Sequence, residues 1–178
     1  TVTNPGDPPI TLLQAFTYIA DTLSTPIGPL TNDGAVTYAF SNCGAPDDFN
    51  FYGFTYASMR ICMNGKIQFG NVGNSDFTES PSDFRLESPA VAIFWDDCMH
   101  PPSILPTTTI SVTETPTLVT INYVNVPRYV AANGYASGAI TLDKTTGEVT
   151  RAWGAGNSQG AIVGITPGFG DLVLSLGE

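Results

Sequence analysis

The sequence predicts an all-β protein, an antiparallel β-sandwich of jelly-roll-like form with an N-terminal extension. Three observations favour this fold class. Charged residues make up only 12% of the chain, and eighteen Gly and fourteen Pro punctuate it as turn residues. Glu, Lys, Arg and Met, which favour helices, are scarce, whereas Thr, Val, Ile, Tyr and Phe, which favour strands, are common. After Gly34, short apolar segments follow one another at the close spacing typical of a sandwich.

Residues 1–34 differ from the rest and are expected to form an extension or assembly segment, with the sandwich domain in residues 35–178. Clusters of Pro, Gly and Asn enclose one apolar stretch, from Ile10 to Leu23. Its apolar residues recur at helical spacing after a possible Thr11 to Gln14 capping box, but they also alternate as in a strand. The Thr and aromatic content favours a strand. The residues expected to make assembly contacts are Ile10, Leu12, Leu13, Phe16, Tyr18 and Ile19.

Two uses of this apolar stretch are open. It can lie on the open sheet of a neighbouring copy, and repetition of that contact without closure would build a filament. Alternatively, it can fold back and cover an edge of its own sandwich, as many proteins do to protect exposed edges.

Eleven strands are expected after the extension, and two hairpins join pairs of them. Asn64-Gly65 has the residues of a type I′ turn, and Gly147 is expected in the left-handed conformation of a second hairpin. The expected strands are Ala35–Phe40, Phe49–Phe51, Ser58–Met63, Lys66–Gly70, Ala90–Trp95, Thr107–Thr113, Leu118–Val124, Tyr135–Asp143, Gly147–Trp153, Ala161–Thr166 and Leu172–Leu176.

The formal net charge of −10 comes from 6 Lys and Arg against 16 Asp and Glu. This field repels nucleic acid and anionic lipid, so neither is an expected partner. No apolar run reaches the roughly 18 residues that a membrane span needs. The first residue is Thr1, and we interpret the chain as the processed form of an extracellular or cell-surface protein.

Several motifs follow one another in order from Phe49 onward. They are Phe49-Asn50-Phe51-Tyr52-Gly53, a strand that ends in Asn64-Gly65, an apolar strand that ends in Phe94-Trp95-Asp96-Asp97, and Ile162-Val163-Gly164-Ile165-Thr166-Pro167-Gly168. In this order they resemble the nidogen-like (NIDO) domain, a β-rich module of secreted and surface proteins. The resemblance covers roughly residues 35 to 170; Cys62, Cys98 and residues 1–34 depart from the module.

The resemblance implies adhesion, matrix or surface architecture and brings no catalytic residues with it. We therefore expect a structural or adhesive surface protein that assembles with copies of itself or with other extracellular components. A carbohydrate- or ligand-binding module is the alternative, and an extracellular hydrolase is a third candidate. The chain has one histidine, His100, and no Gly-x-Ser-x-Gly motif, so we expect no enzyme.

Large aromatic residues gather in the first part of this pattern. Their rings are expected to fill the space between two sheets, and a ligand-stacking face is the alternative. The rings concerned are those of Phe49, Phe51, Tyr52, Phe54, Tyr56, Phe94 and Trp95.

The chain has three cysteines, Cys43, Cys62 and Cys98, at separations that match no zinc motif. One disulfide and one remaining thiol are expected in an exported protein. Three reduced, buried cysteines are the alternative.

Asp96 and Asp97, with His100 nearby, form the best candidate for a charged site. Adjacent carboxylates at a strand end could bind calcium with help from a carbonyl oxygen or from Asp47 and Asp48. However, adjacent strand residues point to opposite faces, so a loop-capping role is the stronger expectation. Calcium is the one cofactor considered, and no other cofactor is expected.

Overall fold

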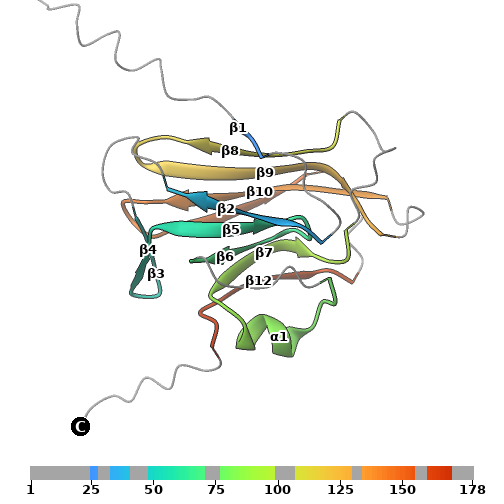
Figure 1. The fold of residues 1–178 in the computed structure, drawn as a ribbon, viewed down its shortest axis with the longest axis horizontal. Helices are drawn as coiled ribbons and strands as arrows, with labels where there is room; N and C mark the ends of the chain where they lie inside the picture. The colour runs from blue at the N-terminus through green and yellow to red at the C-terminus, as the bar shows by residue number, and fades with distance from the viewer. Residues whose placement is uncertain are drawn as a thin grey trace, which may run out of the picture.

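The computed structural model describes residues 25–27, 33–40, 48–70, 77–98, 107–129, 134–154 and 160–169. These residues form two five-stranded antiparallel sheets that pack on each other, together with a separate two-stranded hairpin (Figure 1). The predicted all-β antiparallel sandwich is confirmed. No helix among the described residues is long and apolar enough to cross a membrane.

The first sheet has the strand order β1-β8-β9-β10-β11, and four of its strands are joined by consecutive hairpins. Inward and outward residues alternate along β8, where Ile110, Val112 and Glu114 are buried. Glu114, the third of these inward residues, is therefore an ionisable residue at a buried position. The strands are β1 (Thr25–Pro26), β8 (Thr109–Glu114), β9 (Leu118–Pro127), β10 (Tyr135–Asp143) and β11 (Val149–Trp153).

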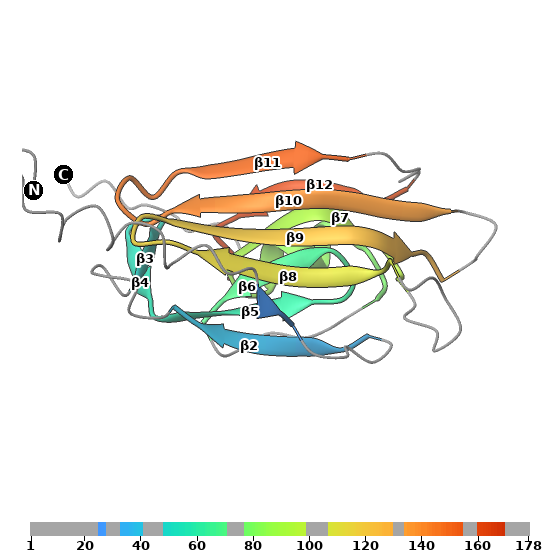
Figure 2. The same ribbon diagram turned by 90° about the horizontal axis from the view of Figure 1, so that it is seen from above.

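The second sheet has the strand order β12-β7-β6-β5-β2 and lies behind the first in Figure 2. Every residue of β6 and β7 is buried. One face meets the first sheet, and on the other face Phe84 of the helix α1 (Pro81–Leu86) packs with Ala90, Ala92 and Trp95 of β7. Phe84 of α1 packs on Trp95 at 5.8 Å between ring centroids. The strands are β2 (Ala35–Ala39), β5 (Ser58–Cys62), β6 (Lys66–Phe69), β7 (Ala90–Trp95) and β12 (Ile162–Thr166).

The third sheet is the hairpin of β3 (Phe49–Phe51) and β4 (Phe54–Tyr56), which lies at one end of the sandwich (Figure 1). Phe49 stacks on Phe69 at 5.2 Å and fixes the hairpin to the core. The aromatic core prediction is confirmed for Phe49, Phe51 and Phe94. Trp95 is buried as well, but it lies on the outer face of the second sheet against Phe84 of α1 and not between the sheets. The prediction is wrong for Tyr52 and Phe54, which are 57% and 55% exposed, because both follow the chain out of the core at the hairpin's turn.

All predicted strands that fall in the described residues are present, with ends that differ by a few residues at most. The prediction Leu172–Leu176 lies outside the described residues. Three elements were not predicted, namely β1, β4 and α1. The helix start does have a sequence signal, since Ser80 caps it by accepting a hydrogen bond from the Asp83 N–H at 3.4 Å, with Pro81 in the first turn.

The end of the predicted extension covers part of an edge of its own sandwich. Thr25 and Pro26 pair with Val112 and Ser111 of β8, and the Ile27 N–H donates to the Ile110 carbonyl at 2.9 Å. At these residues the chain folds back, whereas the apolar stretch from Ile10 to Leu23, for which two uses were expected, lies outside the described residues. The six predicted assembly residues between Ile10 and Ile19 lie outside the described residues.

The Asn64-Gly65 hairpin is confirmed, but its turn type differs from the prediction. Cys62 pairs with Lys66, so the loop has three residues, and of its Asn-Gly pair only Gly65 has a positive φ, of 75°. A type I′ turn needs positive φ at both central residues. That condition is met at Tyr52 and Gly53, with φ of 49° and 81°.

Asn64 contributes through its side chain and not through a positive φ. The side chain is fully buried and forms hydrogen bonds to two other segments of the chain. Its Nδ2 donates to Asp33 at 3.1 Å, and its Oδ1 accepts from the Cys98 N–H at 3.0 Å. The second hairpin follows its prediction, with Gly147 at a φ of 74°.

We predict that Gly65→Ala lowers the free energy of unfolding by about 3 kcal/mol, because the positive φ strains an alanine and the new Cβ would overpack the site. That Cβ would lie 2.8 Å from the Phe94 carbonyl oxygen and closer still to the Phe94 ring. The control is Gly53→Ala, which has positive φ but nothing within 4 Å, and should cost about 1 kcal/mol. Urea unfolding measures both, and equal losses would contradict the packing argument.

Candidate functional site

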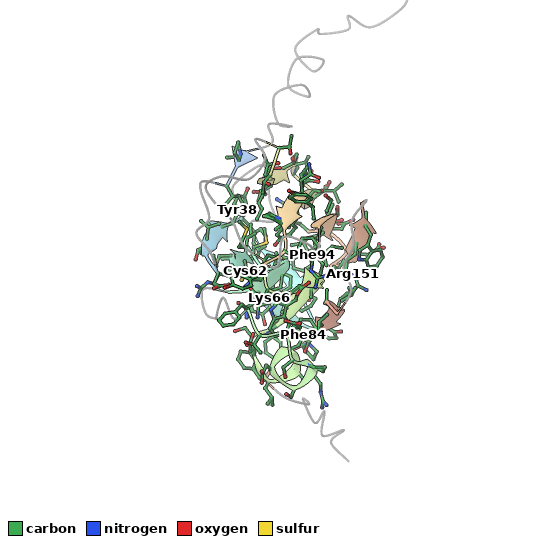
Figure 3. The ribbon with its side chains drawn as sticks, turned by 90° about the vertical axis from the view of Figure 1, so that its right-hand side faces the viewer. Tyr38, Cys62, Lys66, Phe84, Phe94 and Arg151 are labelled. Carbon is green, nitrogen blue, oxygen red and sulfur yellow. The ribbon has the colours of Figure 1, made fainter. Side chains whose placement is uncertain are left out.

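Lys66 is buried completely on the outer face of the second sheet, under α1. Its Nζ donates to the Glu87 carboxylate at 2.9 Å and lies 3.7 Å from the centroid of the Trp95 ring. The Gln68 amide donates to the same Glu87 oxygen at 3.0 Å. Figure 3 shows Lys66 near the middle of the molecule, between Cys62 and Phe84. This ion pair holds the end of α1 against the sheet.

Lys144 is the second lysine of the chain, and its side chain is also fully buried. Its Nζ donates to one oxygen of Glu114 at 2.9 Å, and the Tyr38 hydroxyl donates to the other at 2.6 Å. Glu114 ends β8, Lys144 begins the turn after β10, and Tyr38 lies on β2. The network therefore ties the two sheets together with hydrogen bonds to both carboxylate oxygens.

Asp96, one of the two predicted calcium ligands, is buried and forms an ion pair with Arg128. Burial raises the pKa of Asp96, and the Arg128 guanidinium opposes that rise. Arg128 is also held by a β-bridge to Cys98. The carboxylate of Asp96 thus has an internal cation as its partner and joins the end of β7 to the end of β9.

Asp97 follows Asp96 and is partly exposed. Burial raises its pKa, and the nearby carboxylates of Asp33, Asp96 and Glu79 raise it further. Among the described residues no group of three or more His, Cys, Asp or Glu side chains could hold a metal ion. The strand β3, which Asp48 precedes, lies at the opposite end of the sandwich from the end of β7 (Figure 1). Asp47 and His100 lie outside the described residues.

The structure places Cys62 and Cys98 in the interior, both fully buried. Within the described part of the chain no disulfide joins them, and Cys43 lies outside it. The Cys62 thiol donates to the side-chain amide oxygen Oε1 of Gln68 at 3.7 Å. Burial raises the pKa of Cys62 to about 11 and that of Cys98 higher still, so both are thiols at neutral pH.

The interior thus uses three of the chain's six basic residues, including both lysines. The basic residues outside these three ion pairs are Arg60, Arg85 and Arg151, of which Arg151 donates to the Ala92 carbonyl at 3.5 Å. Because each of the three pairs is neutral, the net charge of −10 belongs to the residues outside these pairs.

Tyr52 and Phe54, which we call the aromatic tip, are the exposed rings at the turn of the β3–β4 hairpin. The Tyr52 ring meets the Phe51 ring edge-on at 4.8 Å between centroids, and Asn50 supports the turn by accepting from the Gly53 N–H at 3.3 Å. A non-glycine residue at positive φ costs about 1–2 kcal/mol. The turn therefore carries backbone strain at Tyr52, whose φ is 49°.

A pocket of about 260 Å³ opens beside the aromatic tip, and we call it the tip pocket. It is lined by Phe51, Tyr52, Gly147, Val149 and Ile165. These residues come from the β3–β4 hairpin, the turn between β10 and β11 with β11 itself, and β12. The sequence did not predict this site, because both tip rings were expected in the core. Phe51 and Phe54 pair across a loop of two residues, and recognition of that short hairpin would have predicted that the rings at its turn are exposed.

We predict that Lys144→Met lowers the free energy of unfolding by about 3–5 kcal/mol, because it leaves Glu114 buried without its cation. The control is Arg85→Met, which removes the same charge from an exposed position and should change stability by less than about 0.5 kcal/mol. Chemical denaturation gives both values. A loss for Lys144→Met as small as that of the control would contradict the role of the pair.

We also predict that Cys62 and Cys98 resist alkylation in the native protein, because the thiolate is the reactive form and both groups are buried protonated. Iodoacetamide at pH 8 followed by peptide mass spectrometry checks this, with the unfolded chain as the reference. Modification at the same rate in both states would refute the burial. Intact mass with and without reductant tests the predicted disulfide.

Comparison with known proteins gives one family. No curated protein and no solved structure matches the chain. The family model described as "NIDO related" matches residues 11–178. The match begins well inside the segment set apart as an extension, and it suggests an extracellular-type domain. It bears out the resemblance to nidogen-like domains drawn from the ordered motifs, and the chain belongs to the NIDO-related family.

Proposed function

We propose that this protein is a secreted structural or adhesive surface protein that works by binding and self-assembly and catalyses no reaction. The observation that carries the proposal is the aromatic tip, where two large rings are more than half exposed on a strained turn. The two rings are neighbours on one turn, and contiguous exposed apolar patches mark interaction sites. Membership of the NIDO-related family supports an extracellular setting.

The interior supports the same proposal. The buried ionisable groups described above have structural partners: Lys66 with Glu87, Lys144 with Glu114, and Asp96 with Arg128. Each pair joins separate elements of the sandwich. A rigid scaffold of this kind holds a binding surface in a fixed shape, which lowers the entropy lost on binding.

Assembly is proposed to use the apolar stretch between Ile10 and Leu23 on a neighbouring copy. The edge of β8 supports this idea, because β1 pairs with only Val112 and Ser111 of this six-residue strand. Within the described residues, the rest of that edge lacks a strand beside it. A neighbour's extended segment could continue the sheet there by the addition of a strand.

We predict that the full chain self-associates and that Phe16→Asp prevents it, because a charge cannot be buried unpaired at the contact. The matched control is Thr22→Asp, which adds the same charge outside the apolar positions and should leave association intact. Light scattering coupled to size-exclusion chromatography, with negative-stain microscopy, measures the assembly. A full chain that stays monomeric at high concentration would remove the assembly role.

A further inference from the structure

We infer that the tip pocket and the aromatic tip bind a lysine or arginine side chain from a basic segment of a partner protein. The inference rests on the proposed binding function and names the partner's chemistry. It follows from the walls of the pocket, the charges around it and the strained tyrosine beside it.

The pocket has the dimensions and walls for one long side chain. At about 260 Å³ it is smaller than the ~300–1,000 Å³ typical of sites for drug-sized ligands. Phe51, Val149 and Ile165 supply apolar groups to a lining that is polar and apolar in similar parts, which suits a side chain with a methylene stem and a charged end, such as Lys or Arg. The Tyr52 ring borders the same space, and an aromatic face within about 6 Å attracts a cation.

Two carboxylates belong to the turn between β10 and β11, which supplies part of the pocket wall. Glu148 is exposed between Gly147 and Val149, two of the residues that line the pocket. Asp143 begins the same turn, and hydrogen bonds from Thr145 lower the pKa of its carboxyl, so it is ionised at neutral pH. The lysine of this turn, Lys144, is turned inward with its side chain fully buried.

The negative charge beside the tip pocket favours a cationic ligand over an anionic one. An anionic ligand would meet Glu148 and Asp143 with no exposed cation from the same turn to balance them. A basic segment is attracted both by these carboxylates and by the chain's net charge of −10. The apolar stem of a Lys or Arg side chain can contact the apolar residues of the pocket while its charged end is attracted by Glu148 and Asp143.

The positive φ of Tyr52 allows a variant that removes the ring without loss of stability, so that binding and folding can be measured separately. At a φ of 49°, Asn is more comfortable than Tyr, so Tyr52→Asn should keep or raise the stability while it removes the ring. It also leaves the net charge unchanged. Tyr129→Asn is the matched control, since it removes a tyrosine that is 53% exposed outside the tip.

The experiment titrates the isotope-labelled full chain with a twelve-residue peptide of alternating Lys and Ser, followed by NMR. We expect shifts at the amides of Gly53, Gly147, Val149 and Ile165, at least tenfold weaker binding for Tyr52→Asn, and unchanged binding for Tyr129→Asn. The melting temperature of Tyr52→Asn should not fall.

Three results would overturn the inference. These are equal binding by Tyr52→Asn and the wild type, equal binding of a Gln-Ser peptide, and shifts at these amides from a neutral trisaccharide but not from the Lys peptide. The proposed assembly is measured separately with the Phe16→Asp variant. Self-association without peptide binding would therefore remove this inference alone.

Discussion

The burial of both lysines is the constraint on which the rest of this structure depends. An ammonium group can leave water only with a carboxylate and further hydrogen bonds beside it. Glu87 and Glu114 must therefore lie inside beside the lysines. Gln68 donates a hydrogen bond to the Glu87 carboxylate, and Tyr38 donates one to the Glu114 carboxylate. The elements that carry these residues must therefore lie against one another. One ion pair fixes α1 on the outer sheet face, and the other joins the two sheets. The apolar core fills the space that these polar contacts define.

The surface charge follows from the composition. Each of the three buried ion pairs is neutral, so the chain's net charge of −10 belongs to the residues outside these pairs. The aromatic tip adds exposed rings at one end of the sandwich. The proposed affinity for basic partners rests on these two features, and the NIDO-related fold provides the scaffold on which the tip is held.

The sequence predicted the fold well because its signals are local. Strands such as Ala90–Trp95 and Tyr135–Asp143 follow from apolar runs between turn residues, and their bounds were predicted correctly. The site was predicted poorly because it depends on long-range pairing. Nothing near Lys144 in sequence indicates that Glu114 will neutralise it, and Asn64 acts through Asp33 and Cys98 rather than through its turn type. The exposure of Tyr52 depends on a turn conformation that a tyrosine rarely adopts.

The most direct test of this account is the reactivity of the two lysine amines. The native protein should be treated with an amine-acetylating reagent at mildly alkaline pH, and the acetylated fraction at Lys66 and Lys144 read by peptide mass spectrometry. Both lysines should remain unmodified in the native protein and react fully once the chain is unfolded, because each amine is buried in an ion pair. Native acetylation of either lysine at the rate of the unfolded chain would contradict the account.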